Sequence, residues 1–159
     1  MNTDNLAETP RGRILVVDDD PFNLKILGRL LQPHHDVFAA LSGVDTLRIA
    51  ACAPQPDLIL LDVMMPDMNG FDVIVRLRDN PATRDIPVIF ATGLDSTEDE
   101  EHGLELGAVD YITKPYRPHI ILARIRTQLE LKRTRERLAN LETELAQRIN
   151  LNPAVSLRQ

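Results

Sequence analysis

Short apolar runs alternate along the chain with segments in which apolar residues recur every three or four positions. The runs have the length of β-strands and are mostly continuous rather than alternating, and they lie at 14–17, 37–40, 58–61, 88–91 and 110–112. Continuous runs are typical of strands that are covered on both faces. The segments between them, such as the one that carries Phe22, Ile26 and Leu30, have the spacing of an amphipathic helix.

This order predicts an α/β fold. Strands that alternate with single helices form right-handed βαβ units, so we expect a doubly wound, mostly parallel five-stranded sheet between two layers of helices. Ligands of such sheets bind beyond the carboxyl ends of the strands. The second run is followed only by Leu41 and Ser42, which suggests a peripheral strand. The other ends carry the candidate site residues, namely Asp18, Asp19, Asp20, Asp62, Thr92 and, two positions after the last run, Lys114.

The last helical segment is too long for one layer of this fold. Residues 118–150 contain neither Gly nor Pro and predict a helix of about 33 residues, roughly 50 Å long. Leu122, Ile125 and Leu129 form the stripe that we expect to face the sheet. This leaves two interpretations of the remainder, a dimeric coiled coil and a single solvated helix. The candidate seam repeats every seven residues, at Leu131, Thr134, Leu138, Leu141, Leu145 and Arg148.

Composition narrows the class of protein. With 159 residues, 43% of them hydrophobic and 26% charged, the chain can build one globular core and an appendage. A net charge of -6 argues against direct nucleic-acid binding, and Glu130 and Glu136 interrupt the basic residues of the last helix. No apolar stretch is long enough for a membrane span, and no signal peptide is recognisable, which predicts a cytoplasmic protein. We expect the single Cys52 to be a small core residue.

The acids at the strand ends suggest a metal site. If the first and third strands are neighbours, Asp18, Asp19 and Asp62 lie close together. Carboxylates at such short distances repel one another unless a cation lies between them. Hard oxygens select Mg²⁺, Mn²⁺ or Ca²⁺, and a site with few protein ligands suits Mg²⁺. A carboxylate beside the metal can act as a nucleophile and form an acyl phosphate. Lys114 would then pair with one phosphoryl oxygen and the hydroxyl of Thr92 with another.

Four stretches of the sequence, ILVVDDD, LILLDVMMPDMNG, VIFATG and GAVDYITKPY, resemble the receiver domain of two-component response regulators. They occur in the family's order and near its spacing, over residues 13–126 of the chain. The resemblance implies a three-layer (βα)5 flavodoxin-like fold with strand order 2-1-3-4-5. It also implies a signalling module rather than an enzyme, which receives its phosphoryl group from a histidine kinase or a phosphotransfer protein.

The resemblance also assigns roles to the strand-end acids. It makes Asp62 the phosphoacceptor. It makes Asp62 and Asp19 direct ligands of Mg²⁺, or of Mn²⁺ in its place. The backbone carbonyl of Met64 is the further protein ligand, and Asp18 assists through water.

Three residues on the other strands complete the implied site. Thr92 and Lys114 are expected to sense the phosphate. Tyr111, three residues before the lysine, matches the aromatic switch position of the family. The peptide bond between Lys114 and Pro115 is expected to be cis, since cis bonds are nearly confined to proline.

Two other functions stay open. A metal-dependent phosphohydrolase would use Asp62 as a nucleophile in repeated turnover, but it would need a second acid two residues on, where the chain has Met64. Leu94 stands two residues after Thr92, so both positions beside the phosphate are apolar and we expect water activation to be hindered. A receiver-fold scaffold that never carries phosphate would not need the Asp, Thr and Lys set.

Simpler structural roles account for other polar residues. An Asp at a strand end is usually a turn or helix cap, and we assign that role to Asp20, before Pro21. The acidic stretch at 95–101 is expected to form the capped first turn of a helix. The four histidines show no ligand spacing and receive no role; they are His34, His35, His102 and His119.

We expect four segments along the chain. Residues 1–12 form a flexible N-terminus, 13–130 the receiver domain, 131–150 a helical extension and candidate coiled coil, and 151–159 a tail. Homodimers are expected to form through the extension. Because extended last helices of receivers often lead into output domains, the sequence is also consistent with a fragment of a longer regulator.

Overall fold

The computed structural model describes residues 11–151 of the chain. Within this range five strands alternate with five helices, and the bounds of each strand agree with the prediction to within one residue. The strands are β1 (Arg13–Val17), β2 (Asp36–Ala40), β3 (Leu58–Leu61), β4 (Val88–Thr92) and β5 (Asp110–Thr113). The helices are α1 (Pro21–Leu31), α2 (Gly43–Ala51), α3 (Gly70–Asp79), α4 (Thr97–Glu105) and α5 (Pro118–Leu151).

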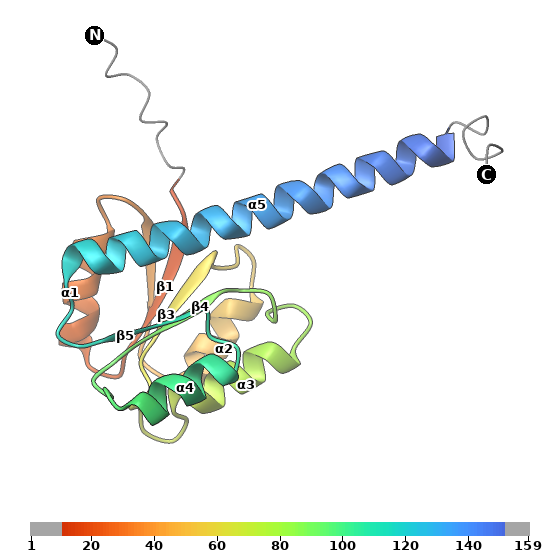
Figure 1. Cartoon of the computed structure of the whole chain (residues 1–159). Coiled ribbons are helices and arrows are strands. Elements are labelled where there is room, and N and C mark those ends of the chain that lie inside the picture. The colour runs from red at the N-terminus through yellow and green to blue at the C-terminus, as the bar shows by residue number, and fades with distance from the viewer. Residues whose placement is uncertain (1–10, 152–159) are drawn as a thin grey trace, which may run out of the picture.

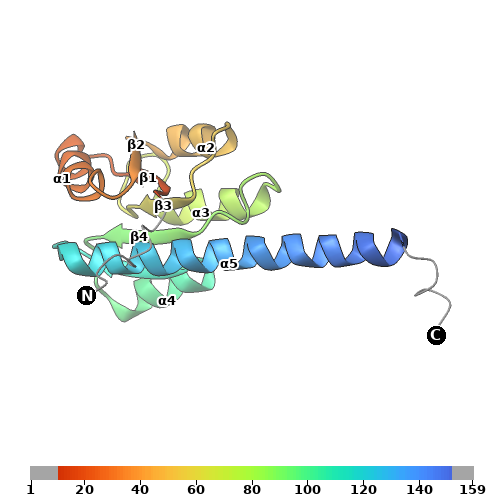
Figure 2. The same ribbon diagram turned by 90° about the horizontal axis from the view of Figure 1, so that it is seen from above.

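The strands form one parallel sheet in the order β2-β1-β3-β4-β5. Helices α1 and α5 cover one face of this sheet and α2, α3 and α4 cover the other, which gives three layers (Figure 1 and Figure 2). The predicted flavodoxin-like fold is therefore confirmed. The chain order reverses between β1 and β3, so the carboxyl ends of these two strands are where a ligand site is expected.

The two faces of the sheet build two separate cores. In β3, Leu58 and Leu60 pack with α1 and α5, whereas Ile59 and Leu61 pack with α2 and α3. All residues of β3 and β4 are buried, which explains why these runs are continuous in the sequence. In β2 only Ala40 is buried, because this strand lies at an edge of the sheet. The prediction of a peripheral second strand is confirmed.

Four helices begin at a side-chain cap. Asp20 accepts a hydrogen bond from a backbone N–H of the first turn of α1, so its predicted capping role is confirmed. Ser96 does the same for α4, at the start of the acidic stretch. Ser42 caps α2 and Asn69 caps α3. These caps determine where each loop at the carboxyl edge of the sheet turns into a helix.

Helix α5 is 34 residues long, as the sequence predicts, but only its first three turns pack on the sheet. Its buried residues are Ile121, Ile125 and Leu129. Leu122, which we expected in the sheet-facing stripe, packs at the margin of this core and is half-buried, because the buried stripe runs through Ile121. Beyond Leu129 the helix leaves the body of the molecule (Figure 1).

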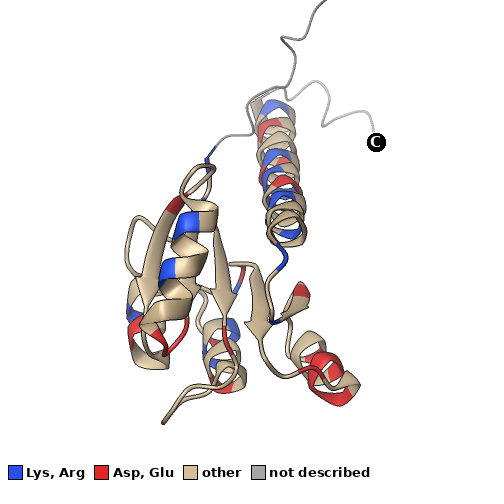
Figure 3. Ribbon diagram, turned by 90° about the vertical axis from the view of Figure 1, so that its left-hand side faces the viewer, with Lys and Arg blue, Asp and Glu red and all other residues tan. Residues whose placement is uncertain are grey.

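The free part of α5 carries the candidate seam. Its basic residues are interspersed with acidic ones along the helix (Figure 3). One turn past the sheet, Lys132 pairs with Asp57, the residue before β3, at 3.4 Å. The seam leucines expose 44 to 58% of their surface, and they are Leu131, Leu138, Leu141 and Leu145.

One prediction about the core is wrong. Cys52 is exposed rather than buried, because α2 ends at Ala51 and residue 52 already belongs to the loop toward β3. The segments predicted at 1–12 and 151–159 lie largely outside the described residues. Among residues 11–151, we find no helix with both the length and the apolar character that a membrane span requires.

Gly70, the first residue of α3, packs against the strand end that carries Asp62. A Cβ atom here would overlap the backbone oxygen of Asp62 and would lie 2.9 Å from Cα of Val63. Since backbone atoms cannot turn aside as a side chain can, Gly70→Ala should lower the free energy of unfolding by about 1 to 3 kcal/mol in urea titrations. In Gly28→Ala, inside α1, the new Cβ meets nothing within 4 Å, so stability should stay equal or rise by up to about 1 kcal/mol. Equal effects of the two substitutions would contradict the packing described here.

Candidate functional site

Two buried carboxylates lie side by side at the carboxyl edge of the sheet. Strands β1 and β3 are neighbours, and Val17 is paired with Leu61. The residues that follow are Asp18 and Asp62, which are 1% and 4% exposed. The N–H of Asp62 donates to the carbonyl of Val17 at 3.0 Å, which holds the end of β3 in register. The strand order thus brings the two acids together.

Asp19 completes a group of three acids. Its carboxylate is exposed, and one oxygen of each of the three acids lies within 4.8 Å of the others. Carboxylate oxygens are hard ligands that suit Mg²⁺ or Mn²⁺ better than zinc. The three side chains therefore fit a divalent cation of this kind. Among residues 11–151, no second group of three His, Cys, Asp or Glu side chains has metal-ligand spacing.

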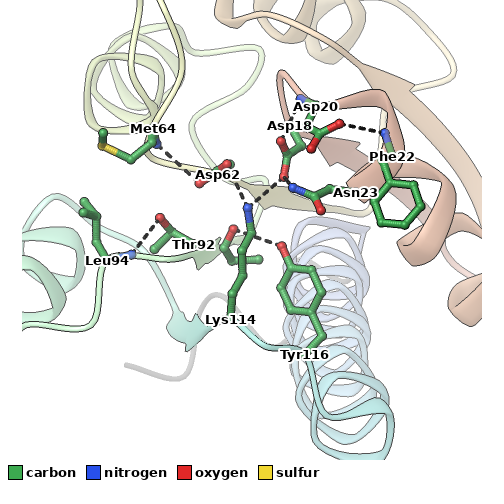
Figure 4. Close-up of polar contacts among 11 residues, drawn as sticks. Asp18, Asp20, Phe22, Asn23, Asp62, Met64, Thr92, Leu94, Lys114 and Tyr116 are labelled. Carbon is green, nitrogen blue, oxygen red and sulfur yellow. Dashed lines mark hydrogen bonds and ion pairs between the residues drawn. The ribbon is translucent and has the colours of Figure 1, made fainter.

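Lys114 reaches the acids from the far side of β4. Its ammonium lies 3.0 Å from Oδ2 of Asp18 and 3.1 Å from Oδ2 of Asp62, and Figure 4 shows it between the two carboxylates. The backbone N–H of Lys114 donates to the carbonyl of Thr92 at 2.8 Å. Its bond to Pro115 is cis, as the resemblance implies. One cation thus serves two buried acids.

Burial and pairing act in opposite directions on these groups. Burial raises the pKa of Asp62, and the hydrogen bond and charge of Lys114 reduce that rise. Burial also lowers the pKa of Lys114, but its hydrogen bonds to Asp18 and Asp62 outweigh burial and raise that pKa above its usual range. Lys114 therefore stays positively charged at neutral pH, next to two acids that have lost most of their contact with water.

Helix α1 also holds Asp18. Oδ1 of this residue accepts from the N–H of Asp20 at 2.9 Å, and Oδ2 accepts from Nδ2 of Asn23 at 3.1 Å. Our sequence reasoning missed Asn23. The signal was the predicted cap at Asp20, since that cap places the first turn of α1, and Asn23 with it, over the end of β1.

A chain of hydrogen bonds joins Thr92 to Tyr111. Thr92 is fully buried, and its hydroxyl oxygen accepts from the N–H of Leu94 at 3.3 Å. The carbonyl of Leu94 accepts from the hydroxyl of Tyr111 at 2.7 Å, so the tyrosine is turned inward. Burial, with the charges of Asp99 and Glu100, raises the pKa of Tyr111 to about 12. The hydroxyl therefore remains protonated and able to donate at neutral pH.

The surroundings of the acids and the lysine are partly apolar. Met64 follows Asp62 by two residues; its N–H donates to Oδ1 of Asp62 at 3.3 Å, and its side chain is 62% exposed. Tyr116, which sequence reasoning also missed, donates from its hydroxyl to the carbonyl of Ala91 at 3.4 Å. The ring of Tyr116 lies 5.9 Å from Nζ of Lys114. Its position in the sequence, two residues after Lys114, was the signal that could have identified Tyr116 as a neighbour of the site.

Known proteins resemble this chain in both sequence and fold. A protein of Vibrio cholerae serotype O1 named "Probable cyclic di-GMP phosphodiesterase" is 45% identical over 139 residues, which cover 85% of this chain and 31% of that protein. The response regulator PleD of Caulobacter vibrioides is 46% identical over 121 residues, 76% of this chain and 26% of PleD. The crystal structure of the response regulator DrrB, a Thermotoga maritima OmpR/PhoB homolog, superposes with a TM-score of 0.67 at 35% identity, over 77% of this chain and 54% of DrrB.

The similarity is concentrated in the α/β body. Both curated relatives are much longer than this chain, which spans less than a third of their length. The family described as the response regulator receiver domain matches residues 14–126, from β1 to the sheet-packed turns of α5. That range contains all of the sheet except Arg13, together with Asp18, Asp19, Asp62 and Lys114. This chain therefore belongs to the response regulator receiver domain family of two-component signalling.

Proposed function

We propose that this chain is a phosphorylation-controlled module in which Asp62 accepts a phosphoryl group from a histidine kinase or a phosphotransfer protein. The domain then changes conformation and controls a partner or an output domain. The observation that carries the proposal is the position of Asp62, a buried carboxylate at a strand end, in contact with Lys114 and within 4.8 Å of two further acids. We also propose that the protein is cytoplasmic, and the free thiol of Cys52 is consistent with a reducing compartment.

The proposed reaction is a phosphoryl transfer. An oxygen of Asp62 forms a bond to phosphorus while the P–N bond of a phosphohistidine breaks. The bonding electrons stay on the imidazole nitrogen, which takes up a proton from solvent. Asp19, Asp62 and the carbonyl of Met64 would hold Mg²⁺, or Mn²⁺, with Asp18 assisting through water. A metal ion held there supplies positive charge between the carboxylate and the phosphoryl oxygens.

Lys114 and Thr92 would respond to the phosphate once it is attached. The ammonium of Lys114 would pair with one phosphoryl oxygen, and the hydroxyl of Thr92 would donate to another. Thr92 is linked through Leu94 to Tyr111 by hydrogen bonds, so a rotation of the Thr92 side chain would change the hydrogen bonding of Tyr111, the proposed switch residue. The phosphate would shift the equilibrium between two conformations by the difference in its interaction free energy with each of them.

A metal-dependent phosphohydrolase is the second candidate, because the same carboxylate could act as a nucleophile in repeated turnover. Hydrolysis of the acyl phosphate would need a group that activates water. The side chains of Met64 and Leu94, two positions after Asp62 and Thr92, are apolar and cannot do this. We therefore favour a long-lived phosphate over turnover. A scaffold without phosphate, the third candidate, gives no reason for the pairing of Lys114 with two buried acids.

We further propose that residues 13–130 act as the receiver and that 131–150 connect it to an output and pair with a second copy. The seam leucines are exposed over this range. Similarity to the Vibrio cholerae protein covers 85% of the chain, so it must run past residue 126 and into this part of α5. That relative is named as a phosphodiesterase, and an enzymatic output of that kind is one that α5 would control.

Intact-protein mass spectrometry tests the phosphoacceptor. Incubation with acetyl phosphate and Mg²⁺ should add one phosphoryl group to the parent chain and none to Asp62→Ala, because both oxygens of Asp18, the other buried acid, already accept hydrogen bonds from Asp20 and Asn23. Asp20→Ala removes a strand-end acid that serves as a helix cap, and it should be labelled like the parent. Equal labelling of Asp62→Ala and the parent would rule out Asp62.

Titration calorimetry tests the metal ligands. Asp19→Asn should weaken Mg²⁺ binding by about tenfold or more, because it removes a charged oxygen ligand from a site with few ligands. Asp20→Asn is the matched control, since asparagine is an equally good cap and Asp20 is not one of the three grouped acids. If both variants bind Mg²⁺ like the parent, Asp19 is not a ligand.

Hydrogen exchange tests the response. Phosphorylation of the parent should change amide protection over residues 109–117, which contain Tyr111 and Lys114. Lys114→Ala should still accept the phosphate but should lose most of this change, because the ion pair that distinguishes the two conformations is gone. Lys132→Ala removes a lysine that pairs on the opposite edge of the sheet and should respond like the parent. A full response in Lys114→Ala would refute the proposed switch.

Sedimentation equilibrium tests pairing through α5. Each seam leucine contributes up to about 1.5 to 3 kcal/mol when it is buried, so dimers should form with modest affinity. Leu138→Asp should weaken association by about tenfold or more. Ala146→Asp adds the same charge outside the seam, at an exposed position, and should leave association within about twofold of the parent. An unchanged association constant in Leu138→Asp would leave α5 as a single solvated helix.

A further inference from the structure

A cleft of about 680 Å³ lies between α5 and the connection that follows α1, and its lining contains no residue of the site described above. We call it the α1–α5 cleft. Its lining comes from Arg11, from the connection between α1 and β2, and from one side of α5. Pro33, Leu122 and Ala123 form its apolar part. Its volume is in the usual range of ligand clefts, roughly 300 to 1,000 Å³.

The charge of this cleft is opposite to that of the chain. The chain has a net charge of -6, yet the cleft is lined by two arginines and three histidines and by no acid. Arg11 is already engaged, since its guanidinium donates to the carbonyls of Gln32, Pro33 and His35 and pairs with Asp36. Arg126, by contrast, makes no ion pair or side-chain hydrogen bond with the other residues that the structure describes. It is a free cation at the cleft.

His35 supplies a neutral donor to the same cleft. The ring is 5% exposed, and Nδ1 accepts a hydrogen bond from the backbone N–H of Gly12 at 3.3 Å. A backbone N–H can only donate, so Nδ1 carries no proton and the proton of the neutral ring lies on Nε2. Burial, with His34 and Arg11 nearby, lowers the pKa of His35, which keeps the ring neutral. Within residues 11–151, this Nε2–H has no acceptor.

The order of residues along α5 suggests how a ligand would lie. His119 and Arg126 are two turns apart on the same side of the helix, and the apolar Leu122 and Ala123 lie between them. Arg126 and His35 line the same cleft, so an anionic group in it can meet both a guanidinium and an N–H donor.

We propose that the α1–α5 cleft binds a small organic phosphate of about the size of a nucleoside monophosphate. Its phosphate faces Arg126 and the Nε2–H of His35. Its organic part lies over Leu122 and Ala123, toward His119 and Pro33. A phosphate suits this end because its three oxygens can accept from a guanidinium and an imidazole at once. The site is separate from Asp62 and does not depend on phosphorylation.

Titration calorimetry of the full chain with adenosine monophosphate tests the proposal. The titration is done in EDTA, so that divalent metal at the acid group contributes nothing. We expect adenosine monophosphate to bind and adenosine to bind about tenfold more weakly or not at all, because charge-assisted hydrogen bonds to the phosphate are lost. Pyrophosphate should also bind more weakly than the nucleotide, since it leaves the apolar part of the cleft uncovered.

Two substitutions on α5 locate the binding. Arg126→Glu reverses the free charge at an exposed position and should weaken binding of adenosine monophosphate by about tenfold or more. Arg124→Glu makes the same change two residues away, where the arginine pairs with Asp110 instead, and should leave binding within about twofold. Asp62→Ala should bind like the parent, which separates this site from the phosphoacceptor.

Each contrary result overturns a stated part of the proposal. If neither adenosine monophosphate nor pyrophosphate binds, or if Arg126→Glu binds as tightly as the parent, the cleft is no anion site. If pyrophosphate binds as tightly as the nucleotide, the apolar contacts contribute nothing and the organic part of the proposal fails. Loss of binding in Asp62→Ala would place the ligand at the acid group instead. None of these results bears on whether Asp62 accepts a phosphoryl group.

Discussion

The close approach of Asp18 and Asp62 is the constraint on which the rest of the domain depends. Two ionised carboxylates that are buried side by side destabilise a fold unless a cation is near. The ammonium of Lys114, about 3 Å from both, provides that charge. Lys114 follows β5 and the acids follow β1 and β3, so the compensation depends on a strand order in which only β4 separates β5 from β3. The electrostatic stability of the site therefore depends on the strand order of the sheet.

The loops at the carboxyl edge are shaped around the same acids. The cap at Asp20 places the first turn of α1 where Asn23 can donate to Asp18. On the other side, α3 begins so close to Asp62 that its first residue, Gly70, has no room for a side chain. Packing this tight leaves few ways to accommodate an added group. The switch that we propose depends on the hydrogen bond between Tyr111 and the carbonyl of Leu94.

Helix α5 belongs to two environments. Up to Leu129 it closes the core against β1, β3 and α1, and beyond that residue its leucines are exposed. Lys132 and Asp57 tie the first free turn to the base of the sheet, so the direction in which the helix leaves is set by the domain. The side of α5 that faces α1 carries a further feature, a positively charged cleft in an otherwise acidic protein. One helix therefore borders the core, a cleft and a free surface.

The sequence by itself determined the strands, the helices, the caps and the edge at which the functional residues gather. These follow from periodicity and from the residues at strand ends, which are properties of neighbouring positions. Only the tertiary structure decided which side chains touch. Lys114 meets acids that are 96 and 52 positions away, and the contacts of Asn23, Tyr116 and His35 likewise depend on how elements pack. The exposure of Cys52 was missed because Pro54 signals that α2 ends nearby but does not determine its last helical residue. Local pattern specifies which surfaces must be buried, whereas the partner that buries each of them is selected by packing over the whole chain.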